Sequence, residues 1–322
     1  MNSTTTLRPS PTALLNPRLD PTFKAIFTQE TPESDEALTS FLSSILGRKI
    51  KNVKLTSNEP AVETIDLLQM SFDVSVTFED DEKACIEMQN RSQNYDYGER
   101  SEIQAARLLN NNAKKGSEWN VEKIYQISVL NFHYDKDDTS EMSWYTMKNQ
   151  SGRELSGHLN VIYIDLLAMK ELFGTPVEKL SPLQKWGLYL SFADDETKSN
   201  YIRQIAESEK GIMEANRIVG RMSEEESNWF REFSLDKARR DYNTSMSNAK
   251  KQGLELGIKE GREEGLKEGR KEGLKEGIQQ KAIEAATNLL KMNILSAEQI
   301  AQAEGLPIET VLELQKALST NA

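Results

Sequence analysis

Residues 72–89, FDVSVTFEDDEKACIEMQ, alternate apolar and polar side chains, and this period of two constrains the fold more than any other feature of the chain. Such a period places successive side chains on opposite faces of a β-strand. The acidic run at 79–83 separates the two alternating halves, so the stretch is expected to form a β-hairpin with one apolar face. The opposite face carries Asp73, Glu87 and Gln89.

The register of this hairpin decides how close its acids lie. We place Phe78 opposite Ala84 across the turn. Counting back from that pair puts Asp73 opposite Gln89 and diagonal to Glu87. Diagonal neighbours on one face lie roughly 7 Å apart, a separation that an oxygen-loving cation between two carboxylates can bridge. The alternative is an amphipathic hairpin whose polar face meets water, and alternation alone favours it because solvated strand faces are common.

Composition excludes several kinds of site. The single cysteine, Cys85, rules out an internal disulfide and a cysteine-cluster metal site. The two histidines, His133 and His158, leave little material for Ser-His-Asp catalysis or a His-rich zinc site. The net charge of -11 means that any contact with nucleic acid would be local.

Composition also predicts a location. No apolar run approaches the ~20 residues that a membrane span needs. The N-terminal segment lacks the charged start and apolar core of a secretion signal. We therefore expect a cytoplasmic protein with no membrane partner.

Helices and strands follow each other in the first half of the chain. Residues 33–47 have the apolar spacing of a helix, and Gly47 ends it. The stretch 94–116 is predicted to be a second helix, with Ile103, Ala106 and Leu109 on its apolar face. The segments KIYQISVLNF and HLNVIYIDL read as strands on either side of a polar loop near residue 140. This order predicts an α/β sheet with one face free for a site.

Glycine recurs at every fourth residue from Gly253 to Gly277. Each glycine inside a helix costs ~1 kcal/mol relative to alanine, which favours a flexible linker. The residues between the glycines are strong helix formers with Glu–Lys pairs at helical spacing, which favours a helix. A repeat of four residues is slightly longer than one helical turn, so the glycines form a stripe without side chains that winds slowly around the helix. Such a stripe lets a second backbone approach closely. We prefer a helix completed by a second copy, and hence a homo-oligomer.

The C-terminal segment has the spacing of a helix-turn-helix at Ala301, Gly305 and Val311. A helix-turn-helix here would predict that the segment recognises DNA. Its second helix, however, carries Glu309 and Glu313 where a reader of base edges needs arginine, lysine or asparagine. A two-helix packing unit is therefore the preferred interpretation.

These segments together resemble one family. The residues that carry the resemblance are LDPTFKAIF, SFDVSV, CIEMQ, YDYGERSEIQAARL, VIYIDL and the glycine tail. In this order they are similar to the recombination-promoting nucleases, also called PD-(D/E)XK family transposases. The resemblance covers nearly the whole chain after residue 16. It implies a restriction-endonuclease-like fold, magnesium-dependent phosphodiester hydrolysis and a DNA substrate.

The resemblance also implies the site residues. Asp73 takes the place of the first acid of the motif and Glu87 that of the second. Gln89 stands where the wider superfamily carries lysine, in agreement with the E-x-Q variant of this family. Asp73, Glu87 and the Met88 carbonyl would then hold Mg²⁺ or another divalent cation, and Gln89 would position the attacking water.

Basic residues near the motif are the expected local contacts to DNA. Arg91, Arg100 and Arg107 follow it closely, although each could also be a solvated arginine. Lys24 lies in the first helix, where Asp20 is alternatively a helix cap.

The sequence thus predicts an α/β, restriction-endonuclease-like (PD-(D/E)XK) core followed by a helical region and a long C-terminal helical tail. The predicted segments are a disordered leader (1–16), the nuclease-like domain (17–172), the helical region (173–250), the glycine-tetrad helix (251–280) and the C-terminal packing unit (281–322). The predicted function is a Mg²⁺-dependent DNA endonuclease, with a role in recombination or transposition expected from the family resemblance. The alternatives are a catalytically inactive binding or assembly module and a DNA-binding regulator.

Overall fold

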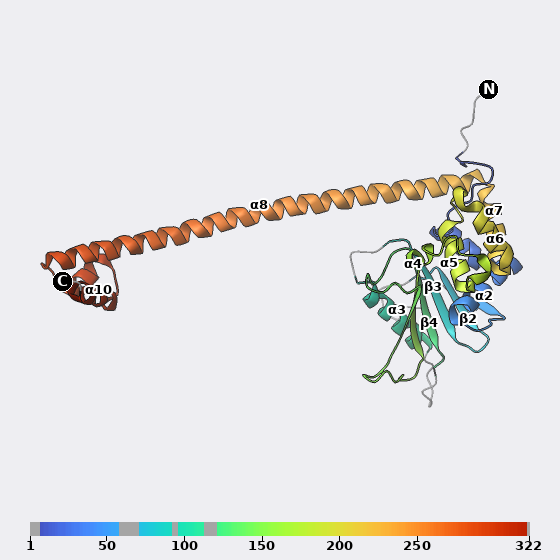
Figure 1. Cartoon of the computed structure of the whole chain (residues 1–322), viewed down its shortest axis with the longest axis horizontal. Coiled ribbons are helices and arrows are strands. Elements are labelled where there is room, and N and C mark those ends of the chain that lie inside the picture. The colour runs from blue at the N-terminus through green and yellow to red at the C-terminus, as the bar shows by residue number, and fades with distance from the viewer. Residues whose placement is uncertain (1–6, 58–70, 92–95, 113–120, 321–322) are drawn as a thin grey trace, which may run out of the picture. The chain divides into compact units, whose positions relative to one another are not determined.

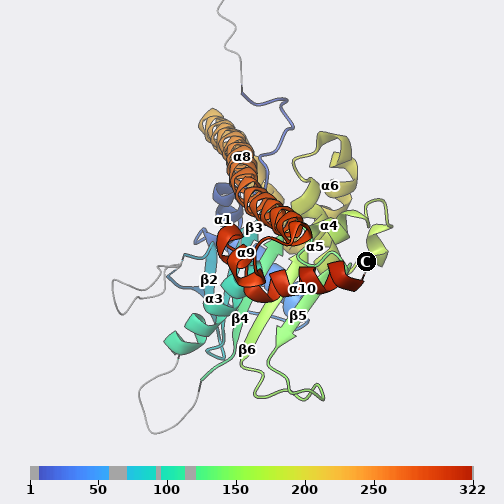
Figure 2. The same cartoon turned by 90° about the vertical axis from the view of Figure 1, so that its left-hand side faces the viewer.

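The computed structural model describes residues 7–57, 71–91, 96–112 and 121–320. The chain forms two compact units, Met1–Asp236 and Lys237–Ala322. The first unit is built on a six-stranded sheet of order β1-β2-β3-β4-β6-β5 (Figures 1 and 2). Its strands are β1 (Val53–Leu55), β2 (Val74–Phe78), β3 (Lys83–Gln89), β4 (Ile124–Leu130), β5 (Met142–Thr146) and β6 (Leu159–Asp165).

The sheet is mixed. Strands β1, β2 and β3 pair antiparallel, β3, β4 and β6 run parallel, and β5 pairs antiparallel with β6. This architecture confirms the predicted α/β core and the two predicted strands β4 and β6. Strand β5 lies in the stretch that the sequence predicts to be a polar loop. It is an edge strand with Trp144 and Tyr145 about two-fifths exposed (40% and 44%), so it lacks the apolar run of a central strand.

The β2–β3 hairpin is tighter than the sequence predicts. Val76, not Phe78, pairs with Ala84. The Phe78 N–H donates to the Glu82 carbonyl at 2.9 Å, and Asp81 takes a φ of 61°. Aspartate tolerates this left-handed conformation better than most residues, so the turn spans residues 79–81 rather than 79–83.

This shorter turn corrects the predicted neighbours of the acids. A shift of two residues keeps each side chain on its expected face but changes the residue opposite it. Continuing the register from the Val74–Ile86 pair places Asp73 opposite Glu87 instead of diagonal to it. Asp73 itself precedes β2 and lies in a bend.

One face of the sheet carries the larger core. The helices that contribute to it are α1 (Asp20–Thr28), α2 (Pro32–Leu46), α4 (Leu166–Lys170), α5 (Pro182–Phe192), α6 (Ser199–Ser208) and α7 (Lys210–Ser223). Phe41 joins the sheet side to the helical region, because its ring centroid lies 5.2 Å from Phe27 and 5.1 Å from Trp186. The boundary predicted at residue 172 therefore does not separate two cores.

The predicted disordered leader also needs correction. Ala13 and Leu15 are buried in the same core. The Leu15 N–H donates to the Ser223 hydroxyl oxygen of α7 at 2.9 Å. The part of the leader that the structure describes, residues 7–16, is thus attached to the domain.

Helix α3 (Tyr97–Asn112) packs on the opposite face of the sheet, against β4 and β6. Its predicted apolar face is wrong at two of three residues: Ile103 (53% exposed) and Ala106 are exposed, and only Leu109 packs against the buried cluster. The buried positions are instead Gln104 (2% exposed) and Ala105 (0%). The buried face is partly polar because the strands beneath it present polar side chains.

The C-terminal half is helical. Its helices are α8 (Glu226–Met292), α9 (Ala297–Glu304) and α10 (Ile308–Thr320). The glycine repeat lies within α8, as the helical interpretation predicts, and a Cβ on any glycine from Gly253 to Gly277 would meet nothing within 4 Å. At the end of the chain Ala301 and Val311 are buried together, and Gly305 closes α9 with a φ of 64°.

Of the helices that the structure describes, none combines the length and the apolar character that a membrane crossing requires.

Candidate active site

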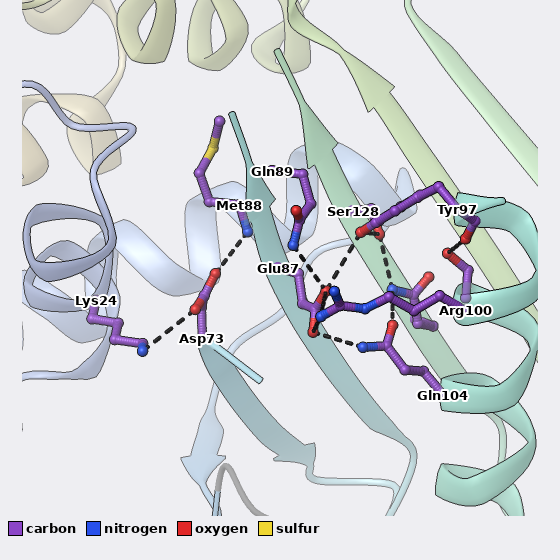
Figure 3. A network of polar contacts seen from close by, with 11 residues as sticks. Lys24, Asp73, Glu87, Met88, Gln89, Tyr97, Arg100, Gln104 and Ser128 are labelled. Carbon is purple, nitrogen blue, oxygen red and sulfur yellow. Dashed lines mark hydrogen bonds and ion pairs between the residues drawn. The ribbon is translucent and has the colours of Figure 1, made fainter. Parts of the chain in front are cut away.

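Glu87 of β3 is buried beneath α3, with 3% of its side chain exposed (Figure 3). The Gln104 side-chain amide donates to Oε1 at 2.7 Å. The Arg100 guanidinium lies 3.3 Å from both carboxylate oxygens, and the Tyr97 hydroxyl donates to Oε2 at 3.4 Å. These charge-assisted contacts offset the cost of removing a carboxylate from water.

A second ring of polar side chains holds these donors. The Tyr97 and Ser128 hydroxyls lie 3.0 Å apart. The Gln126 side-chain amide donates to the Ser128 hydroxyl at 2.9 Å and to the Gln104 side-chain oxygen Oε1 at 3.2 Å. Sequence reasoning missed this network. Its signal is present in β4, where Gln126 and Ser128 alternate inside an apolar strand, and in α3, where Tyr97 and Gln104 stand two turns apart.

Asp73 has a different set of neighbours. Its Oδ2 accepts a hydrogen bond from the Met88 N–H at 2.8 Å. Its Oδ1 lies 3.4 Å from the Lys24 ammonium of α1, which also contacts Asp20 at 2.7 Å. Figure 3 shows Lys24 approaching Asp73 from α1 and the α3 side chains approaching Glu87. Met88, predicted to contribute its carbonyl to a metal, thus contacts Asp73 through its N–H.

The surroundings of Asp73 disfavour its charge. Burial raises the pKa of Asp73 to about 6, and the hydrogen bond and negative charge of Asp20 act in the same direction. The Met88 N–H and the Lys24 charge oppose this rise. Burial also acts to lower the pKa of Lys24, but its hydrogen bonds and charge interactions with the two aspartates outweigh burial, so that pKa is raised. Two carboxylates therefore share one lysine.

The remaining predicted residues occupy separate positions. Gln89 donates to Glu87 Oε2 at 3.3 Å, so it lies beside the second acid as expected. Arg100 is held by Glu87 rather than standing apart as a DNA contact. Arg107 is half-buried on α3, and Arg91 lies two residues after the end of β3. The structure also brings a lysine, Lys24, next to the first acid from a different element than the β3 position that holds Gln89.

The residues around Asp73 and Glu87 show whether the two acids fit a divalent cation. Within the described ranges, no three His, Cys, Asp or Glu side chains gather closely enough to hold a metal ion. The chemistry of the donors nevertheless fits one, because carboxylate oxygens are the ligands that Mg²⁺ prefers. Burial raises the pKa of Asp73, and the hydrogen bond and charge of Asp20 add to the rise; a cation beside this carboxylate would favour its charged form.

Comparison with known proteins identifies the family of the chain. Neither the curated proteins nor the solved structures provide a match to the chain. A family model described as PD-(D/E)XK nuclease family transposase matches residues 17–249, which include the whole sheet and every candidate site residue. The chain therefore belongs to the PD-(D/E)XK nuclease family transposases.

Proposed function

We propose that this protein is a metal-dependent DNA endonuclease that hydrolyses phosphodiester bonds and acts in DNA recombination or transposition in the cytoplasm. The observation that carries the proposal is the pair of acids Asp73, in the bend just before β2, and Glu87, in β3, both of them largely buried and both within the family match. Membership in a nuclease family supports a DNA substrate.

Asp73, Glu87 and the Met88 carbonyl are the proposed ligands of Mg²⁺. When bound, the ion lowers the pKa of a water and neutralises charge on the scissile phosphate. Gln89 orients that water, since its amide already lies 3.3 Å from a Glu87 oxygen. Gln104 and Tyr97 hold the Glu87 carboxylate in one orientation, as supporting side chains do for metal ligands.

Lys24 supplies the positive charge that Gln89 lacks. Its ammonium lies 3.4 Å from Asp73, close enough to stabilise a charged transition state developing beside that acid. The Arg100 side chain contacts Glu87 and is 37% exposed. It neutralises the Glu87 charge in the metal-free site, and once a cation is bound there its guanidinium can contact a DNA phosphate. Arg91 and Arg107 complete the proposed DNA contacts.

Nicking of supercoiled plasmid by the purified protein tests this function. Cleavage should require Mg²⁺ or Mn²⁺ and should be abolished by Asp73→Asn. Lys24→Gln should lower the rate by roughly a hundredfold, in line with the loss of one charged transition-state contact. Asp81→Asn, in the exposed hairpin turn, is the control and should cleave normally. A parent protein inert with every divalent metal would defeat the proposal.

A second candidate is a catalytically inactive nuclease-fold module that binds or assembles. The Glu87 network favours it, because an arginine and three neutral donors already satisfy the carboxylate. Retention of DNA by a protein that does not cleave under any metal would support this reading. A regulator that acts through α9 and α10 is disfavoured by Glu309 and Glu313. Tight duplex binding by residues 281–322 at near-physiological salt would revive it.

We also propose that a second copy completes α8. The seven glycines from Gly253 to Gly277 lie on exposed helix with open space where a Cβ would stand. A bare stripe of this kind permits close approach of a second backbone, and homo-oligomerisation would compensate the helical cost of the glycines.

A further inference from the structure

A cavity of about 170 Å³ opens on the α3 side of the sheet, and none of the predicted site residues lines it. Its apolar wall comes from β6, through Leu159 and Val161. Its aromatic walls are Tyr134, Tyr145 and Tyr163, from three separate segments. The cavity therefore has the composition of a ligand pocket, with aromatic walls on an apolar base.

The three tyrosines are inclined to one another. Tyr163 is 5% exposed and forms the inner wall. The Tyr134 ring centroid lies 4.8 Å from it at 65°, and that of Tyr145 lies 5.4 Å from it at 63°. Tyr134 and Tyr145 are 40% and 44% exposed, so they stand at the mouth. Both outer rings thus meet Tyr163 edge to face, and all three tyrosines line the cavity.

Gly98, in the first turn of α3, makes room for this arrangement. A Cβ at Gly98 would overlap the Tyr134 hydroxyl, because that hydroxyl packs directly against the helix backbone. The glycine thus lets Tyr134 approach the helix that carries the polar part of the pocket, Glu102. Gly98 and Glu102 lie one turn apart on α3.

Three acidic side chains act on the mouth of the pocket. Burial raises the pKa of Tyr134, and the charges of Asp96, Glu102 and Asp135 raise it further. Among the described residues that line the cavity none is lysine, arginine or histidine. An anionic ligand such as a nucleotide phosphate would meet these acids, whereas a cation would be attracted by them.

We propose that this cavity binds an organic monocation, the guanidinium or alkylammonium head of an amino-acid side chain or of a free small molecule. The faces of Tyr134, Tyr145 and Tyr163 carry negative quadrupole density that attracts such a head, and Glu102 supplies the balancing charge. The exposed mouth admits the alkyl stem. The proposal is independent of nuclease activity.

Ligand-observed NMR titrations of the full-length protein test the proposal with matched probes. Choline and 3,3-dimethylbutan-1-ol have the same shape and differ in charge, so the cation should bind roughly tenfold more tightly, as a desolvated cation–aromatic contact predicts. Nα-acetyl-arginine amide represents a side-chain source. Tighter binding of the blocked arginine assigns the pocket to a protein partner, and tighter binding of choline assigns it to a small molecule. Affinity should fall with added salt.

Variants separate the pocket from non-specific binding. Tyr145→Ala should weaken cation binding roughly tenfold, and Glu102→Gln should weaken it while keeping the shape of the pocket. Tyr242→Ala, an exposed tyrosine of α8, and Glu99→Gln, an exposed acid of α3, are the controls and should bind as the parent does. Equal affinity for choline and its neutral analogue, cation binding indifferent to both pocket changes, or a preference for nucleosides would each overturn the proposal.

Discussion

Replacing Asp73 with asparagine should stabilise the metal-free protein at neutral pH. Asparagine keeps the shape of the side chain and can still accept the Met88 N–H, but it removes a charge that lies beside Asp20 and away from water. The pKa of Asp73 rises from 3.8 to about 6 on folding. Since one pKa unit corresponds to about 1.4 kcal/mol, the ionised side chain destabilises the fold by at most about 3 kcal/mol.

The net gain is smaller than this limit. Asp73 is 18% exposed, and the substitution also removes the ion pair with Lys24, which stabilises the charged form. We expect a gain of about 1–2 kcal/mol above pH 7, and hence a rise in Tm of roughly 2–8 °C for a unit of this size.

The pH dependence of the stability gain shows whether the charge of Asp73 causes it. Because the folded-state pKa of this acid is raised, the native protein binds more protons than the unfolded chain between pH 3.8 and about 6, so its stability falls as pH rises through that window. The gain from Asp73→Asn should therefore be near zero at pH 4 and complete above pH 7. Thermal melts in EDTA, followed by circular dichroism, measure it, with Asp81→Asn as the control. A gain independent of pH, or a less stable variant at pH 8, would refute the reasoning.

Three further predictions concern other parts of the molecule. Gln89→Ala should slow plasmid nicking by roughly ten- to a thousandfold because it removes one polar transition-state contact, whereas Gln89→Lys should keep or raise the rate; a loss with lysine as severe as with alanine would argue against shared geometry. Gln104→Leu should lower the unfolding free energy by about 2–3 kcal/mol in a urea titration, since it removes the donor that lies 2.7 Å from Glu87. The control Ala106→Leu, on the exposed side of α3, should have little effect. Deleting residues 253–280 should convert a dimer to a monomer in light scattering, and an unchanged number of copies would contradict self-association through α8.

The sequence predicts well where one physical rule acts alone. Alternation identifies β2 and β3, and the apolar runs identify β4 and β6, because burial on one or both faces leaves a plain periodic pattern. The helix over the glycine repeat is also predicted, because the residues between the glycines have strong helical propensity.

The sequence misleads where two rules compete. The face of α3 is misassigned because a buried carboxylate requires buried donors, and Gln104 therefore lies inside while Ile103 lies outside. The hairpin register is misassigned because Asp81 adopts a left-handed conformation that pattern counting does not include. Strand β5 is missed because an edge strand is stabilised by pairing with β6 more than by burial.

The candidate site also has one part that the sequence pattern predicts and one part that it does not. The positions of Asp73, Glu87 and Gln89 follow from the pattern and the family resemblance. The assignment of Lys24 to Asp73 depends on how α1 packs beside the sheet, a contact between residues 49 positions apart that no local pattern encodes. The order of the motif therefore predicts the acids but not their counter-charges.

Binding of Mn²⁺, counted by electron paramagnetic resonance, tests most directly the claim that Asp73 and Glu87 act on one shared ion. The parent should bind Mn²⁺ at a saturable site from which Mg²⁺ displaces it. Asp73→Asn and Glu87→Gln should each abolish that site, because neither carboxylate alone retains a divalent cation against water. Saturable binding that survives either substitution, or a parent without such a site, would contradict the account.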